Sequence, residues 1–294
     1  MNSPPRGSDG PLPSPSPRGR RRSVAVRGVF PRPAAWQAAA VVVCYLAWFL
    51  AVGRVVALLA GDRVEGDLLA SAGGILLGLA LPIGVGALSL LLFARRRGVL
   101  RDLFARRRGG GRRWMWCGPI LVLLAVAGHL GTVDPHAWSL SRVLALALAG
   151  LCVGVAEEFL TRGLVVRILR DAGRSERYTM LVSSLLFALL HTANLLSGVP
   201  VATVATTVVY TFGFGVCMYL TLRVTGSLWA AILLHALTDP TTMLATGGID
   251  RAAGGAAGGA WTALTGLATA AMIVLALVAV PLLGRRRTGR TAPA

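Results

Sequence analysis

The chain has 294 residues, of which 55% are hydrophobic and 14% charged, and its mean hydropathy is +0.67. This composition is too apolar for a soluble protein of that length and indicates a membrane protein. The net charge of +18 does not point to nucleic acid, because the arginines lie in tails and short loops rather than along one folded face. The four cysteines show no C-x-x-C spacing, so neither a disulfide framework nor a thiolate metal site is expected.

The chain divides into a long apolar region and two basic tails. Residues 1–33 are rich in Pro, Ser, Gly and Arg and lack the apolar core of a cleavable signal, so a disordered basic tail is predicted. Residues 34–284 form one predicted membrane domain, and residues 285–294 form a basic C-terminal tail. Eight segments of the domain are long enough for a hydrocarbon core of about 30 Å. They are Ala34–Gly61, Leu68–Ala94, Trp114–Val133, Arg142–Leu169, Thr179–Leu196, Val201–Leu222, Ser227–Thr246 and Ala260–Leu283.

These segments predict an all-α polytopic membrane protein with about eight transmembrane helices in one bundle, because helices satisfy every backbone group in lipid and the alternating pattern of a barrel is absent. Charge then sets the expected orientation. Arginine clusters fall on one side of this arrangement, at Arg18–Arg22, Arg95–Arg97, Arg106–Arg113, Arg167–Arg177, Arg223 and Arg285–Arg290. The other loops carry few arginines, so both termini are predicted to be cytoplasmic. We expect a multi-pass protein of the bacterial cytoplasmic membrane.

Three of the predicted helices carry ionisable side chains in their apolar stretches. Such a group costs roughly 2.5–3.5 kcal/mol at bilayer depth, so groups of this kind are rarely kept without partners and a use. Glu157 and Glu158 lie roughly 17 Å from the arginine-rich end of the fourth helix, His191 roughly 18 Å along the fifth, and His235 and Asp239 roughly 12 Å and 18 Å along the seventh. The sequence therefore predicts one shared, partly hydrated site in the inner half of the bilayer.

Helical spacing separates the two glutamates. Glu158 and Arg162 are four residues apart and are predicted to pair, whereas Glu157 is turned about 100° away and is expected to be the freer carboxylate. His235 and Asp239 share the same spacing. Two small residues just before the glutamates, Gly150 and Gly154, predict close approach of a neighbouring helix.

The set of a carboxylate, two imidazoles and a second carboxylate suits peptide hydrolysis, which needs a proton shuttle and stabilisation of an oxyanion. Glu157, His191, His235 and Asp239 would make a reasonable zinc site. The same four groups could hold a water molecule without metal, and the sequence leaves both alternatives open.

The motifs also carry a family resemblance. The segments 157–163, 187–191 and 235–239 read EEFLTRG, FALLH and HALTD. They resemble the E-E-x-x-x-R, F-x-x-x-H and H-x-x-x-N/D motifs of the CPBP family, which groups type II CAAX prenyl endopeptidases with bacteriocin-processing and immunity (Abi) proteins. The resemblance covers about Arg142–Thr246. Thr161 stands where an aromatic residue is common, and Asp239 replaces the asparagine of the eukaryotic prenyl proteases.

The resemblance implies an eight-helix intramembrane protease in which Glu157 and His191 activate water and His235 with Asp239 stabilises the oxyanion. Family members are described both as metalloproteases and as glutamate-dependent enzymes. Glu158 joins the expected catalytic set, although its spacing from Arg162 favours a structural pair. Supporting roles are expected for Arg162, Phe187 and Asn194.

The predicted function is therefore hydrolysis of a peptide bond in a membrane-associated protein or peptide, with that substrate and the lipid bilayer as partners and no nucleic acid. A non-catalytic immunity or scaffolding protein is the alternative. A proton-coupled transporter is a third hypothesis, and it is disfavoured because the sequence shows no internal repeat or pair of broken helices. The sequence does not specify the substrate, its prenylation or the oligomeric state.

Overall fold

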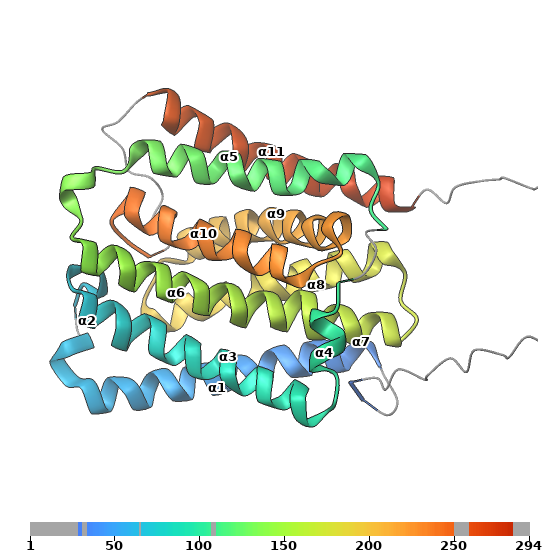
Figure 1. Cartoon of the computed structure of the whole chain (residues 1–294), viewed down its shortest axis with the longest axis horizontal. Coiled ribbons are helices and arrows are strands. Elements are labelled where there is room, and N and C mark those ends of the chain that lie inside the picture. The colour runs from blue at the N-terminus through green and yellow to red at the C-terminus, as the bar shows by residue number, and fades with distance from the viewer. Residues whose placement is uncertain (1–28, 31–33, 65, 107–109, 250–258, 285–294) are drawn as a thin grey trace, which may run out of the picture.

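The fold was obtained as a computed structural model, which describes residues 29–30, 34–64, 66–106, 110–249 and 259–284. Every regular element among them is helical (Figure 1). The α-helices are α1 (Ala35–Ala60), α2 (Ala72–Gly74), α3 (Leu81–Arg96), α4 (Leu100–Phe104), α5 (Cys117–Thr132), α6 (Leu140–Glu158), α7 (Val166–Asp171), α8 (Glu176–Leu190), α9 (Val201–Thr225), α10 (Leu228–Thr246) and α11 (Ala260–Gly284). Apart from residues 29 and 30, the two predicted tails lie outside the described residues.

Short helical turns of other geometry join or extend these helices. The 3-10 turns are η1 (Gly61–Val64), η2 (Leu68–Ala70), η4 (Arg113–Trp116), η5 (Pro135–Ala137) and η7 (His191–Ser197). Two π-helical turns, η3 (Ile75–Ala80) and η6 (Phe159–Val165), lie within otherwise continuous helices.

Seven helical segments of the described chain are long and apolar enough to cross a membrane, and each coincides with a predicted span. They are Ala35–Val64, Ala72–Arg96, Arg113–Thr132, Leu140–Asp171, Glu176–Ser197, Val201–Thr225 and Ala260–Leu283. The remaining predicted span, Ser227–Thr246, forms α10 but is not among the seven. Its histidine, aspartate, proline and threonines lower its hydropathy. The multi-pass membrane architecture is confirmed, and the count of eight is not.

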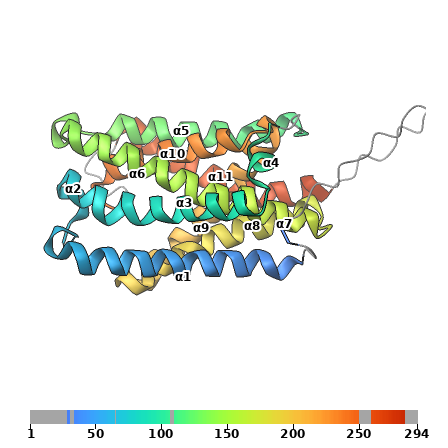
Figure 2. The same cartoon turned by 60° about the horizontal axis from the view of Figure 1, so that its bottom comes forward.

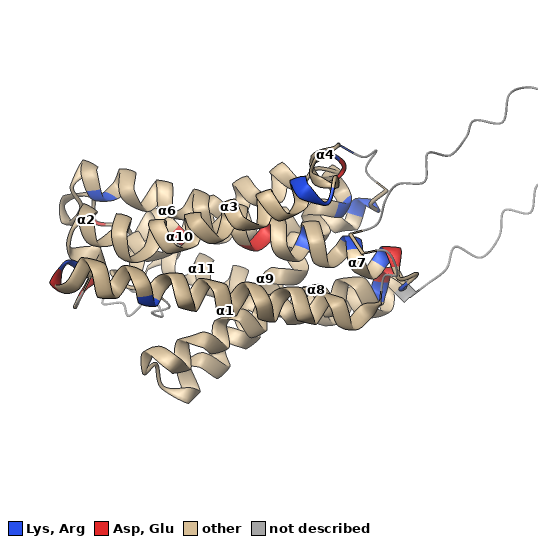
Figure 3. Cartoon of the chain, turned by 90° about the horizontal axis from the view of Figure 1, so that it is seen from below, with Lys and Arg blue, Asp and Glu red and all other residues tan. Residues whose placement is uncertain are grey.

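The helices run along the long axis of one bundle (Figures 1 and 2). Helix α6 packs against α10 and α3, α5 against α11, and α8 against α9. The start of α1 and the end of α11 lie at the same end of the bundle (Figure 1). Most of the arginines lie at this end, around α4 and α7 (Figure 3). That arrangement is the one expected if both termini share a compartment, but which compartment remains a prediction.

Two glycines of α6 bring α10 close to it. A Cβ atom on Gly154 would lie 2.6 Å from the carbonyl oxygen of Ile232, and one on Gly150 would lie 2.7 Å from that of Ala236. Both distances are shorter than real Cβ contacts, so any larger side chain would push the helices apart. The predicted small-residue face is confirmed, and its neighbour is the helix that carries His235 and Asp239.

Helix α6 does not end at the glutamates but continues through the π-helical turn η6 into α7. All seven residues of η6 are buried. A π-helical turn carries one extra residue and therefore rotates everything beyond it relative to a continuous α-helix. The two glutamates and the arginines of α7 thus face directions that a regular helix would not give them.

Candidate active site

A cavity of about 220 Å³ lies inside the bundle between α1, α3, α6, α8, α9 and α10. Glu157, His191, His235 and Asp239, from three different helical segments, all line it. The structure thus brings the four groups around one cavity, as a shared site requires, and their depth in the membrane stays a prediction. The lining also includes Asn194 and Ile249, so the cavity extends from the level of Glu157 towards the arginine-poor end of the bundle.

Glu157 is the carboxylate that faces the cavity without a partner. Its Oε2 atom is buried and has no hydrogen-bond partner among the described residues. Oxygen atoms of buried carboxylates normally accept hydrogen bonds from protein or water, so this atom is placed to hold a water molecule. The expectation that Glu157 is the freer glutamate is borne out by this geometry.

Glu158 lies away from the cavity lining, in a buried cluster with Arg162 and His235. Its Oε1 atom is 3.3 Å from Arg162 Nη1, and both side chains are 0% exposed. The same oxygen is 2.8 Å from His235 Nδ1. Because an ionised carboxylate can only accept, Nδ1 is the donor of this hydrogen bond. Glu158 therefore joins the first motif to the third, and its position fits a supporting role rather than the catalytic set.

Arg162 is held on several sides, as a buried cation requires. It donates from Nη2 to the carbonyl oxygen of Gly215 at 2.7 Å and from Nη1 to Thr161 Oγ1 at 2.5 Å. The residue that replaces the usual aromatic side chain, Thr161, thus contributes a hydrogen bond to the arginine. Its own hydroxyl donates to the carbonyl oxygen of Glu157.

Phe187 connects the three motifs through its ring. The Arg162 guanidinium carbon lies 4.5 Å from the ring centroid, within the range of a cation–π contact. The rings of His191 and His235 meet Phe187 edge-on, at centroid distances of 5.4 Å and 5.7 Å. Phe214 of α9 adds a second edge contact to His235 at 5.0 Å. Aromatic packing therefore fixes the orientation of both imidazoles.

His191 and Asp239 complete the lining. His191 Nδ1 is 3.3 Å from the carbonyl oxygen of Phe187. In the tautomer that donates this hydrogen bond, Nε2 is the acceptor nitrogen. Asp239 Oδ2 is 3.6 Å from His235 Nε2, which is longer than a hydrogen bond, so a small shift of either group could make or break the contact.

The predicted zinc set is not assembled in this geometry. Both nitrogens of His235 face carboxylate oxygens, of Glu158 and of Asp239. Among the described residues, no group of three or more His, Cys, Asp or Glu side chains is placed to hold one metal ion. Zinc binding by Glu157, His191, His235 and Asp239 stays a prediction, and the chemistry below is derived without it.

The structure also brings in residues that the sequence did not single out. Tyr45 and Phe49 of α1 and Tyr210 and Phe214 of α9 line the cavity. Tyrosines in the middle of apolar spans were an available signal, since a hydroxyl in lipid needs a partner. The phenylalanines could not have been found, because only packing separates them from ordinary lipid-facing residues.

Residues 137–241 match the family described as Type II CAAX prenyl endopeptidase Rce1-like. All three motifs lie within the match, which supports the predicted kinship with the CPBP/CAAX proteases. The matched family is a family of proteases, and the match covers about a third of the chain. No curated protein and no solved structure matches the chain.

Proposed function

We propose that the protein is an intramembrane endopeptidase in which Glu157 and His191 activate a water molecule. The observation that carries the proposal is the cavity itself: four titratable side chains from three motifs line it, and a buried Glu157 oxygen there has no hydrogen-bond partner among the described residues. The family match supports the reaction class.

Glu157 and His191 act together on the water molecule. Glu157 accepts a proton from the water molecule as its oxygen attacks the carbonyl carbon of the scissile peptide bond. The acceptor nitrogen of His191 orients the same water through its second hydrogen. When the tetrahedral intermediate collapses, the C–N bond breaks and Glu157 returns the proton to the leaving amine nitrogen.

His235 supplies the hydrogen-bond donor for the oxyanion. Its Nδ1–H is held by Glu158, and its Nε2 side is only loosely engaged by Asp239. In the imidazolium form, which carries a hydrogen on each nitrogen, Nε2–H would be donated to the carbonyl oxygen in place of its loose contact with Asp239 and would stabilise the charge as it develops. Asp239, when ionised, can only accept hydrogen bonds. We therefore assign it the orientation of His235 or of a substrate N–H, rather than donation to the oxyanion.

The cavity lining indicates the kind of substrate. Around the polar groups, the walls are aromatic and aliphatic, with Phe49, Tyr210 and Phe214 among them. Such walls favour a peptide segment with apolar side chains that lies within the membrane. Prenylation of that segment remains an expectation from the family resemblance.

The proposal is tested by replacing one carboxylate with its amide. We expect Glu157→Gln, purified and reconstituted in liposomes, to cleave a quenched apolar peptide library at least about 100-fold more slowly than wild type, the usual effect of losing a general base. Asp62→Asn makes the same chemical change at an exposed position and should leave cleavage unchanged. Size-exclusion profiles establish that both variants fold.

Three outcomes discriminate between mechanisms. If folded Glu157→Gln cleaves the library as fast as wild type, Glu157 is not the general base. Cleavage that stops with chelator and returns with zinc would show that the metal set assembles after all. The non-catalytic alternative holds if folded wild type cleaves nothing in the library and a Glu157/His191 double variant still restores the phenotype of a strain that lacks the gene.

A further inference from the structure

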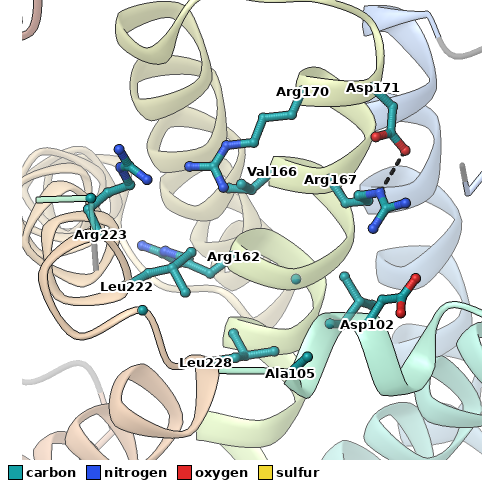
Figure 4. A pocket seen from close by; sticks show the side chains of 14 residues that line it. Asp102, Ala105, Arg162, Val166, Arg167, Arg170, Asp171, Leu222, Arg223 and Leu228 are labelled. Atoms are coloured by element: carbon teal, nitrogen blue, oxygen red, sulfur yellow. Dashed lines mark hydrogen bonds and ion pairs between the residues drawn. The ribbon is translucent and has the colours of Figure 1, made fainter. Parts of the chain in front are cut away.

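A second cavity, of about 280 Å³, lies at the arginine-rich end of the bundle (Figure 4). Its walls come from α4, η6, α7, the end of α9 and the start of α10. Four arginines line it: Arg162, Arg167, Arg170 and Arg223. None of the four residues proposed for catalysis does, so this cavity is distinct from the candidate active site.

The arginines are unevenly compensated. Arg167 pairs with Asp171 at 2.8 Å. Arg170 and Arg223, from separate helices, both contact one carboxylate oxygen, Glu176 Oε1, at 3.5 Å and 2.5 Å. One carboxylate cannot neutralise two guanidinium groups, so this corner of the cavity carries a surplus positive charge.

A second observation at the same cavity comes from Arg162. Its side chain is buried, and its Nε atom has no hydrogen-bond partner among the described residues. Unpartnered buried donors are rare in proteins and mark places where a ligand or water completes the site. Arg162 lies eight residues before Arg170, or roughly 12 Å further along the helix from the arginine-rich end.

The remaining walls are apolar on several sides, with Leu103, Val166, Leu222 and Leu228. Figure 4 shows Arg162, Arg170 and Arg223 on one side of the cavity and Asp102 on the other. An anion bound by the arginines is thus kept apart from the opposing carboxylate. Apolar walls beneath a basic rim fit an amphiphile better than a hydrated ion.

We propose that this cavity binds a phosphate group, with Arg170 and Arg223 as its main ligands. Guanidinium groups bind phosphate oxygens through paired N–H donors. The two arginines lie near the ends of their helices, where membrane-spanning segments meet the lipid headgroups, and basic pockets between membrane helices bind anionic headgroups. The phosphate comes either from an anionic phospholipid of this leaflet or from a soluble phosphate. The proposal does not depend on proteolysis.

The test measures binding to the purified full-length protein in detergent. Native mass spectrometry and thermal unfolding are followed with phosphatidylglycerol, phosphatidylcholine or inorganic phosphate. We expect phosphatidylglycerol to bind and to raise the unfolding midpoint, and the Arg170→Gln/Arg223→Gln double variant to weaken that binding about tenfold or more, the equivalent of about one charge-assisted hydrogen bond. Arg101→Gln/Arg177→Gln removes the same charge from exposed positions at the same end and should bind like wild type.

A further variant gives an effect of opposite sign. Glu176→Gln removes the shared carboxylate and should tighten phosphate binding, whereas a cluster with a purely structural role would only lose stability. This readout holds even if the double variant fails to fold. A response to inorganic phosphate alone assigns the site to a soluble phosphate. Equal binding of both lipids, or binding that neither Glu176→Gln nor the arginine substitutions change, overturns the proposal.

Discussion

At the scale of single residues, the molecule contains two ion pairs with the same spacing and very different surroundings. Glu158–Arg162 and Arg167–Asp171 are both four residues apart on one continuous helical segment. The first pair is fully buried, while Asp171 retains 24% side-chain exposure. Burial strengthens the attraction between the two charges. When one partner of a buried pair is lost, the other charge stays buried without compensation, which is strongly destabilising.

We therefore expect Glu158→Gln to lower the free energy of unfolding by about 3 kcal/mol, near the lower end for a broken buried pair because the amide can still accept one hydrogen bond. Asp171→Asn should cost less than about 1 kcal/mol, as at other partly exposed pairs. Unfolding in detergent, followed by helical circular dichroism against denaturant, measures both. Equal losses in the two variants would contradict the difference in burial.

Phe187 and Phe214 orient the two histidines of the candidate active site. Neither ring can transfer a proton, yet both contact His235, and Phe187 also contacts His191. They are positioning residues, whose loss changes the orientation of an imidazole rather than its chemistry.

We expect Phe214→Leu to lower kcat about tenfold, with a smaller change in KM, because the carbonyl is still bound while the donor is misaligned. Phe214→Tyr, which keeps the ring, should recover most of the rate. A fall in stability without a change in kcat would show that the ring serves packing alone.

At the scale of helices, the contact between α6 and α10 sets the geometry of the site. These helices carry Glu157 on one side and His235 with Asp239 on the other, and Gly154 holds them in near contact. A methyl group placed there would press on the backbone of Ile232, which cannot rotate away.

We expect Gly154→Ala to destabilise the protein by about 1–3 kcal/mol through overpacking and to reduce cleavage as well, since it moves His235 away from Glu157. Gly53→Ala is the matched control, because nothing lies within 4 Å of its added Cβ in α1. Parallel measurements of unfolding and cleavage test both effects. An unaffected Gly154→Ala protein would mean that α10 can shift without cost.

At the scale of the whole molecule, charge and cavity are arranged along one axis. The arginines gather around α4 and α7 (Figure 3), whereas the cavity of the candidate active site extends towards Asn194 and Ile249 at the opposite end. If the arginine-rich end is cytoplasmic, as predicted, the cavity extends towards the outer face. The predicted depth of the site, in the inner half of the bilayer, stays a prediction.

Labelling of single cysteines tests that arrangement. In intact cells carrying a protein without its four native cysteines, a membrane-impermeant maleimide should label Asp134→Cys and Asn194→Cys. It should label Arg101→Cys only after permeabilisation. The reverse pattern would invert the orientation of the bundle, and protection of Asn194→Cys alone would show that the cavity is closed to that side.

Much of this architecture follows directly from the sequence. Hydropathy located seven of the spans, because lipid imposes length and composition on each segment separately. Helical spacing gave the Glu158–Arg162 pair, the shared face of His235 and Asp239, and the free Glu157, since contacts four residues apart are local. The eighth span failed the same criterion because its histidine, aspartate, proline and threonines lower the mean hydropathy of α10.

Other features were decided only by the tertiary structure. The contact of Glu158 with His235 spans 77 residues, and no periodicity within either helix encodes it. The π-helical turn after the glutamates has no signal in the apolar pattern, because it is stabilised by packing on all sides. The basic cavity forms where arginines of α7 and α9 meet one carboxylate. Sequence determines which groups each helix offers, and packing determines which of them meet.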